Sequence, residues 1–328
     1  MSNGTKVEQQ TFDGANTQKW IFTHIGSNVY TIRSTKNNSY YLGIQNDSTA
    51  DETPIALRTG TVTNGMKWKV EKANQGYKIV SYSDPTMVLC TGTASATAGT
   101  NLKLSDFQSG NDSYQDEWDI EPYQVVLYGI TNAGHDHISC LNTIGDSISN
   151  DSEINIRGGA ISSVTCKNDL ISTNLFTSRS HGYLITYIGT NDVCSTGILL
   201  NDEEVDSEKV TFFSHSWSNI SAGSSYILPT DDYSRIDIAV FIGCNTARGK
   251  EGGRNLPSKI VEKGARAAVG FSDTIDCSDA NTWTIQLYQK LLQGASLQEA
   301  VDYACDRATE DSGLKSAVIC GDNSITIF

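Results

Sequence analysis

Short stretches of alternating hydrophobic and polar residues recur through residues 1–122. Such stretches predict short strands at 29–32, 40–44, 77–80 and 87–90. The segments between them are dense in Asn, Thr, Ser and Gly, which favour turns and loops. The pattern therefore predicts an all-β region with few helices.

A tryptophan repeats along this region with a nearly constant spacing. Trp20, Trp68 and Trp118 lie 48 and 50 residues apart, and each opens an alternating stretch. Self-similarity at a fixed period indicates repeated supersecondary units that share one core. Three such units close into a barrel, which leaves no sheet edge exposed. We expect the three tryptophans to be core residues, because indole rings bury a large apolar area.

The repeat resembles that of the ricin-type β-trefoil lectins, whose signature is Gln-x-Trp. Gln18-Lys19-Trp20 keeps the signature, and the other two repeats keep the tryptophan alone. No strand pair precedes the first repeat, so either the chain begins further upstream or the trefoil is incomplete. The resemblance implies glycan binding through an aspartate after the second strand of a repeat. Gly43 and Thr91 occupy the matching positions, so that carboxylate is absent from both.

From Val125 onward the hydrophobic pattern changes. Continuous apolar runs predict strands buried on both faces of a parallel sheet, at 125–130, 175–188, 236–243 and 265–271. Helical spacing appears at 256–263, 281–293 and 297–307, and Ser296 with Glu299 forms a capping box before the last. Strands that alternate with helices predict an α/β domain with a mainly parallel sheet flanked by helices, over residues 123–328.

Two of these strands end in residues that can carry chemistry. His181-Gly182 follows one strand and Gly243-Cys244 ends another. A cysteine nucleophile needs a neighbouring base, and imidazole is the usual one. The backbone N–H groups of Gly182 and Cys244 are candidates for an oxyanion hole. His215 is a weaker alternative to His181, because no glycine follows it.

This order of motifs resembles the clan CD cysteine peptidases, which include caspases, gingipains, clostripain and CHAT-type proteases. Their His-Gly and Cys end successive apolar strands, and three later segments also match: 264–270, 288–304 and 321–324. The resemblance implies a caspase-like cysteine endopeptidase with Cys244 as nucleophile and His181 as general base and acid. The alternative is a carbohydrate-binding or interaction protein whose peptidase-like domain is inactive.

Three carboxylates are candidates for the substrate pocket of such a peptidase. Asp136 follows the first strand of the α/β region, and Asp273 and Asp276 follow the strand after Cys244. A carboxylate pairs well with a basic side chain, so we expect cleavage after Arg or Lys. Solvation of the surface explains any single aspartate equally well.

The two resemblances imply a protein or peptide substrate and, through the trefoil, a glycan as partners. The net charge of −14 argues against nucleic acid, which basic clusters bind. The eight cysteines are spread singly, which gives no zinc pattern. No cofactor is expected, although the acidic residues 202–204 leave calcium open. No apolar run is long enough to span a bilayer, and the first residues do not resemble a signal peptide. We therefore expect either a secreted protein whose signal is absent from this sequence or a cytoplasmic one.

Overall fold

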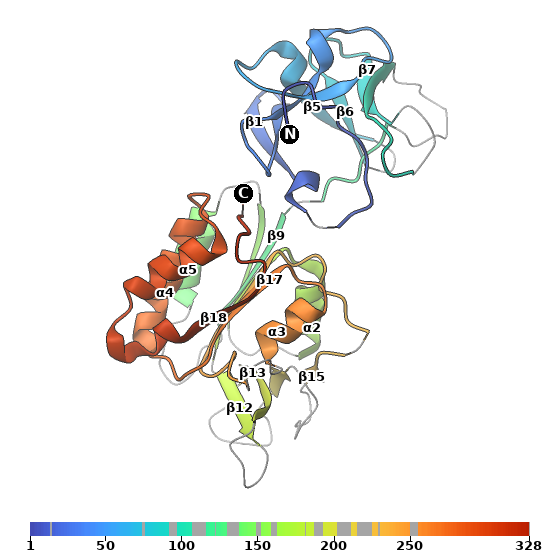
Figure 1. Cartoon of the computed structure of the whole chain (residues 1–328). Coiled ribbons are helices and arrows are strands. Elements are labelled where there is room, and N and C mark those ends of the chain that lie inside the picture. The colour runs from blue at the N-terminus through green and yellow to red at the C-terminus, as the bar shows by residue number, and fades with distance from the viewer. Residues whose placement is uncertain are drawn as a thin grey trace. The chain divides into compact units, whose positions relative to one another are not determined.

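The computed structural model divides into two compact units, Met1–Pro122 and Tyr123–Phe328 (Figure 1). The structure describes residues 1–13, 15–73, 76–91, 97–106, 116–121, 123–129, 138–148, 152–158, 163–180, 182–186, 193–201, 211–214, 225–228, 230–249 and 255–327.

Antiparallel strands and single-turn helices make up the described part of the N-terminal unit. The strands pair in the order β4-β3-β2-β5-β6-β7-β8, and β1 pairs with β2. Their bounds are β1 Trp20–Gly26, β2 Val29–Ser34, β3 Tyr41–Ile44, β4 Ile55–Arg58, β5 Lys67–Lys72, β6 Tyr77–Ser81, β7 Met87–Cys90 and β8 Lys103–Asp106. The short helices are η1 Asn16–Gln18, η2 Gln45–Asp47 and η3 Asn64–Met66. The four strands predicted from alternation are therefore confirmed as β2, β3, β6 and β7.

A ring of backbone hydrogen bonds closes this unit with three-fold character. Val7 N–H donates to the Ile55 carbonyl at 3.0 Å, Ile55 to Leu102 at 3.0 Å, and Leu102 back to Val7 at 2.8 Å. All three side chains are buried in the same cluster. The three positions recur with about the spacing of the tryptophans, so each belongs to a different repeat. The segment around Val7 therefore supplies the third member of a symmetric closure, as expected of a trefoil.

The tryptophans perform equivalent structural tasks in successive repeats. The Trp68 indole N–H donates to the Leu42 carbonyl at 3.0 Å, and that of Trp118 donates to the Leu89 carbonyl at 3.1 Å. Trp68 is completely buried, and Trp20 and Trp118 pack against the same core. Trp118 forms an isolated bridge with Tyr77 and opens no strand, unlike the other two. The predicted core role of the tryptophans is confirmed.

The C-terminal unit contains a six-stranded sheet of the described residues, in the order β10-β9-β11-β16-β17-β18. Neighbouring strands are parallel except β17 and β18. The strands are β9 Tyr123–Gly129, β10 Ser152–Gly158, β11 Leu175–Arg179, β16 Ile238–Ile242, β17 Ala267–Phe271 and β18 Ala317–Gly321. A mainly parallel sheet, predicted from the apolar runs, is confirmed.

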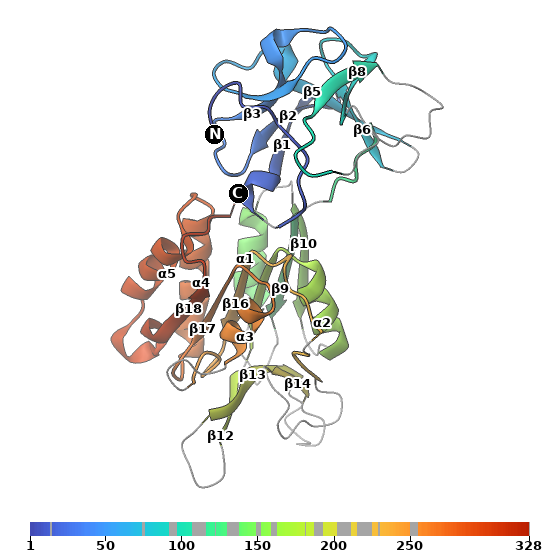
Figure 2. The same ribbon diagram turned by 45° about the vertical axis from the view of Figure 1, so that its right-hand side comes forward.

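Helices cover both faces of this sheet (Figures 1 and 2). The helices α1 Ile138–Ser147, α4 Cys277–Leu291 and α5 Leu297–Asp306 bury one face, and α2 Ser163–Ser172 and α3 Leu256–Glu262 bury the other. Two short helices, η4 Glu310–Ser312 and η5 Leu314–Ser316, precede β18. Because both faces are covered, the ends of the strands are where polar chemistry can reach solvent.

A smaller sheet follows β11 in the chain. Its strands β12 Gly182–Thr186, β13 Val193–Asn201, β14 Thr211–Ser214 and β15 Ser225–Tyr226 pair in that order. Residues 175–188, predicted as one strand region, include strands of both sheets. Strand β11 ends at Arg179 and β12 begins at Gly182, the glycine of the predicted His-Gly motif.

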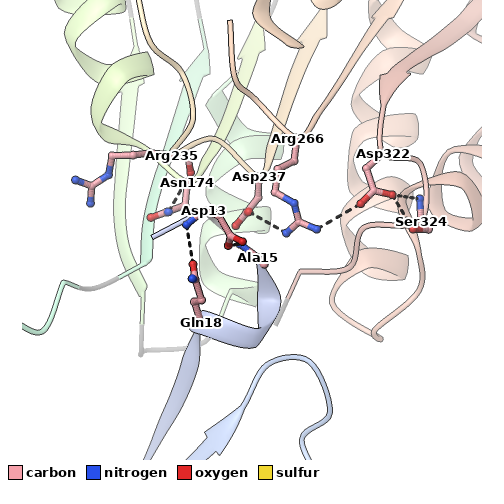
Figure 3. A network of polar contacts seen from close by, with 9 residues as sticks. All are labelled: Asp13, Ala15, Gln18, Asn174, Arg235, Asp237, Arg266, Asp322 and Ser324. Atoms are coloured by element: carbon pink, nitrogen blue, oxygen red, sulfur yellow. Dashed lines mark hydrogen bonds and ion pairs between the residues drawn. The ribbon is translucent and has the colours of Figure 1, made fainter. Parts of the chain in front are cut away.

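A polar network connects the amino-terminal ends of the parallel strands in the large sheet. The Arg266 guanidinium contacts Asp237 at 3.4 Å and Asp322 at 3.3 Å, and Asp322 accepts from Ser324 N–H at 3.0 Å (Figure 3). Asn174 donates from its side chain to the Arg235 carbonyl at 3.2 Å. These contacts lie at the starts of β11, β16 and β17, so they stabilise the sheet away from the predicted reactive residues.

Candidate active site

Cys244 lies two residues beyond the end of β16, at the carboxyl-terminal ends of the parallel strands. Its side chain is half-buried and its thiol is free. The sulfur accepts a hydrogen bond from Ile275 N–H at 3.4 Å and lies 3.8 Å from the Ile275 carbonyl oxygen. The thiol is therefore held in one orientation by the loop that follows β17, the next strand of the sheet.

The turn after Cys244 is strained and locked. Asn245 has a φ of 58°, a left-handed conformation that costs a non-glycine residue about 1 kcal/mol or more. Its N–H donates to the Asp273 carbonyl at 2.9 Å. The fully buried Thr246 hydroxyl accepts from Phe271 N–H at 3.0 Å. Such strain persists only where surrounding contacts enforce it, and it is common at functional sites.

The predicted oxyanion donors are the N–H groups of Cys244 and Gly182. Within the described ranges, no residue accepts a hydrogen bond from the Cys244 amide. Gly182 is the first residue of β12 and pairs with Ile198. The oxyanion role of the pair remains a prediction.

His181, the predicted base, lies outside the described residues, as do His215 and Asp136. The residue before His181 is described: Ser180 N–H donates to the Ile242 carbonyl at 3.1 Å. This bond extends the pairing of β11 with β16 by one residue. It brings the chain just before His181 beside the chain just before Cys244.

The two described carboxylate candidates have different surroundings. Asp273 is exposed, and its carboxylate accepts from Thr274 N–H at 2.7 Å. Asp276 is the N-cap of α4, and its carboxylate accepts from the N–H groups of Ser278 at 2.8 Å and Asp279 at 3.0 Å. Asp276 therefore has a structural task that the sequence analysis did not assign, because it started the helix at residue 281. A pocket role for either aspartate remains a prediction.

Arg179, the last residue of β11, is a further residue of the candidate site that was not predicted from the sequence. Its side chain is only 2% exposed. Nε donates to the Asn281 side-chain oxygen at 2.9 Å, and one terminal nitrogen donates to the Cys277 carbonyl at 2.5 Å. The signal in the sequence is a charged residue inside the Leu-Phe-Thr-Ser-Arg strand, two positions before His181.

Five of the other described cysteine side chains fit structural roles better than Cys244 does, while half-buried Cys277 has its sulfur 3.7 Å from an Arg179 terminal nitrogen. Cys90, Cys140 and Cys166 are buried. Burial raises the pKa of the Cys166 thiol, and it also raises the pKa of Cys305 and of Cys320. These shifts disfavour the thiolate, which is the nucleophilic form.

The described part of the chain contains neither a cluster of metal-ligating side chains nor a helix that could span a membrane. No three His, Cys, Asp or Glu side chains gather there in an arrangement that could hold a metal ion. No described helix combines the length and apolar character needed to cross a bilayer. The acidic residues 202–204, which left calcium open, lie outside the described residues.

Comparison with known proteins gives one family match. Residues 1–58 match the family described as ricin-type beta-trefoil lectin domain-like. The chain matches none of the curated proteins. The family match and the described barrel-like sheet together support a ricin-type β-trefoil lectin-like domain in the N-terminal unit.

Solved structures resemble parts of the chain. The designed three-fold symmetric protein ThreeFoil is 22% identical, with a TM-score of 0.34 over 36% of this chain and 81% of that one. The Rhizoctonia solani agglutinin is 17% identical, with a TM-score of 0.31 over 36% of this chain and 78% of that one. A Saccharomyces cerevisiae separase–securin complex is 15% identical, with a TM-score of 0.35 over 61% of this chain and 12% of that one.

Proposed function

We propose that the C-terminal unit is a caspase-like cysteine endopeptidase with a Cys244–His181 dyad. The observation that carries the proposal is the setting of Cys244: a half-buried, oriented thiol on a strained turn at the carboxyl edge of a parallel sheet. Sites of open α/β folds gather at this edge. The hydrogen bond from Ser180 to Ile242 supports a close approach of residue 181 to the same edge.

The chemistry of such a dyad is acyl transfer through a thioester. Cys244 Sγ attacks the peptide carbonyl carbon while His181 accepts the thiol proton, and the amides of Cys244 and Gly182 stabilise the oxyanion. His181 then protonates the leaving amine as the C–N bond breaks. Water adds to the thioester and gives a proton to His181. The C–S bond breaks and the proton returns to sulfur.

The proposed substrates carry Arg or Lys before the scissile bond. Exposed Asp273 supports this choice, because its backbone carbonyl already contacts the turn after Cys244. The Asp273 carboxylate can pair with the basic side chain of such a substrate. Asp136 and Asp276 are the other proposed pocket residues.

The N-terminal unit is proposed as a glycan-binding module that targets or supports the peptidase, on the strength of its family match. A glycine stands where the lectins carry their sugar-binding aspartate, and a Cβ at Gly43 would lie 2.8 Å from the Arg58 side chain. Sugar binding here would therefore use other polar groups. If the dyad is inactive, the protein is a carbohydrate-binding or interaction protein instead.

Peptide hydrolysis tests the peptidase proposal. We expect the full chain to hydrolyse fluorogenic peptides with Arg or Lys before the scissile bond, and not those with Asn or Asp. Cys244→Ala and His181→Ala should each abolish turnover, because they remove the nucleophile and the base. Cys320→Ser is the matched control and should retain turnover. Absence of turnover with every peptide, in the presence and absence of calcium, would rule out the peptidase.

A glycan array tests the targeting module. The full-length Cys244→Ala protein, which cannot cleave, should bind at least one glycan class. An array without any binding would remove the lectin role and leave the peptidase proposal unaffected.

A further inference from the structure

We infer that Arg179 is a positioning residue that fixes the loop around Ile275, and with it the Cys244 thiol of the candidate dyad. The inference rests on the proposed function and extends it to a residue that touches neither substrate nor reacting atoms. Arg179 stands two residues before His181, and its guanidinium binds Cys277, two residues after Ile275. Ile275 in turn contacts the Cys244 sulfur.

The first step of the argument is the register of the sheet. Arg179 of β11 lies opposite Ile242 of β16. The adjoining Ser180 N–H bonds to the Ile242 carbonyl. The backbone thus fixes the ends of the two strands side by side. The loop beyond β17 is held by backbone bonds from Asn245 to Asp273 and from Asp276 to Ser312, and Arg179 adds a link from β11 to the helix that follows it.

The second step is the contact between β11 and α4. Arg179 Nε and one terminal nitrogen reach the side chain of Asn281 and the carbonyl of Cys277, which lie in the first two turns of α4. Thr177, on the same face of β11, contacts the Tyr288 hydroxyl further along this helix. The planar guanidinium binds two acceptors at fixed angles, so it defines the position of the helix start. The loop before the helix, which contains Ile275, is positioned with it.

The third step is the free-energy cost of burying the charged Arg179 guanidinium. The guanidinium is almost fully buried, and within the described chain no carboxylate forms an ion pair with it. Burying an unpaired charge is strongly unfavourable, and apolar replacements of buried charged groups often stabilise proteins. A buried charge whose described partners are neutral acceptors beside the candidate site points to a role in that site.

The test compares three full-length variants. Arg179→Met keeps a long side chain and removes the guanidinium. Arg179→Lys keeps the positive charge but lacks the planar set of N–H donors. Arg266→Met is the matched control, because Arg266 belongs to the same sheet but lies at its opposite edge with two carboxylate partners. The measurements are kcat and KM on the peptide that the wild type cleaves, the Tm, and the rate at which iodoacetamide alkylates Cys244.

We expect Arg179→Met to lower kcat about 10- to 100-fold with KM changed less than about threefold, since misplacing a catalytic group by roughly 1 Å has effects of this size. Its Tm should be unchanged or higher. Arg179→Lys should not restore kcat. The alkylation rate of Cys244 should change more than about threefold in Arg179→Met while that of Cys320 stays constant. Arg266→Met should lower the Tm and leave kcat unchanged.

Wild-type kcat and alkylation in Arg179→Met would overturn the inference, as would an activity loss that follows a fall in Tm. If the wild type cleaves no peptide, the proposed peptidase fails while the alkylation measurement still decides this inference. A changed Cys244 rate then supports positioning of the thiol by Arg179, and an unchanged rate refutes it.

Discussion

Thr246 connects three segments of chain at the turn after Cys244. Its hydroxyl accepts from Phe271 N–H and lies 3.1 Å from the carbonyl oxygens of both Phe241 and Gly243. The side chain is completely buried, so no water can replace these contacts. One hydroxyl group thus links the strand before the nucleophile, its turn and the neighbouring strand.

Replacing this hydroxyl should therefore be costly. Thr246→Val keeps the shape of the side chain but leaves Phe271 N–H unsatisfied. We expect a loss of about 1–3 kcal/mol in the free energy of unfolding, measured by urea titration. Thr246→Ser retains the hydroxyl and should lose less. Equal losses for the two variants would show that the methyl group, and not the hydrogen bond, is what matters.

Single residues of the candidate site differ in how far the sequence could predict them. Cys244 was found because an apolar run ends directly before it, which local pattern reveals. Arg179 was missed because its partners, Cys277 and Asn281, are remote in the chain and only the tertiary structure brings them near. Asp276 was assigned to a pocket because its capping role depends on where α4 starts, and periodicity fixes helix starts poorly.

At the scale of elements, the loop from β17 to α4 depends on a close approach by another turn. Gly313, between η4 and η5, has a φ of 69°. A Cβ there would lie 1.9 Å from the Thr274 carbonyl oxygen. The neighbouring residue of this loop, Ile275, orients the Cys244 sulfur. The turn at Gly313 therefore packs against the loop that orients the Cys244 sulfur.

Gly313→Ala should lower the free energy of unfolding and displace the loop that orients the Cys244 sulfur. We expect a loss above about 2 kcal/mol, because the methyl group and the carbonyl oxygen cannot coexist without movement of the backbone. Gly294→Ala is a matched control: its φ of 82° imposes similar strain, but nothing lies within 4 Å of the added atom. The control should lose only about 1 kcal/mol. Similar urea midpoints for the two variants would contradict the importance of the contact with Thr274.

The elements that the sequence predicted best are the central ones. The strands β16 and β17, and β9 from Val125 onward, contain no charged residue and are buried on both faces. Strand β10 is the outer strand of the sheet, and of its described side chains Ile154 and Ile156 pack against the core, which is too little pattern for a prediction. Helix α2 was not predicted from the sequence, because polar residues interrupt its apolar positions.

At the scale of the whole molecule, carboxylates in both units stabilise the fold in a pH-dependent way. The pKa of Asp47 is lowered, chiefly by a hydrogen bond from Arg58, and the pKa of Asp322 is lowered, chiefly by one from Ser324. A carboxylate with a lowered folded-state pKa contributes stability above its unfolded pKa, and the contribution disappears as the pH falls through the folded value. Asp116, whose pKa is raised by burial, acts in the opposite direction.

We therefore expect both units to lose stability between pH 5 and roughly pH 2. Solvent screens these exposed pairs, so the loss from each is on the order of 0.5 kcal/mol. Urea unfolding of the full chain at several pH values measures it. Asp322→Asn should reduce the pH dependence of the C-terminal unit and leave that of the N-terminal unit intact. A midpoint that rises on acidification would mean that relief of the net negative charge outweighs the lost hydrogen bonds.

The backbone ring of Val7, Ile55 and Leu102 has a consequence for how the protein is made. Its members come from opposite ends of the N-terminal unit, so the ring can form only after the ribosome has released the chain beyond Leu102. Contacts between such distant residues also slow folding. During translation the segment around Val7 lacks its partner Leu102, and the early hairpins exist without the closure that stabilises them. The nascent chain is thus most open to chaperones and proteases before the last repeat emerges.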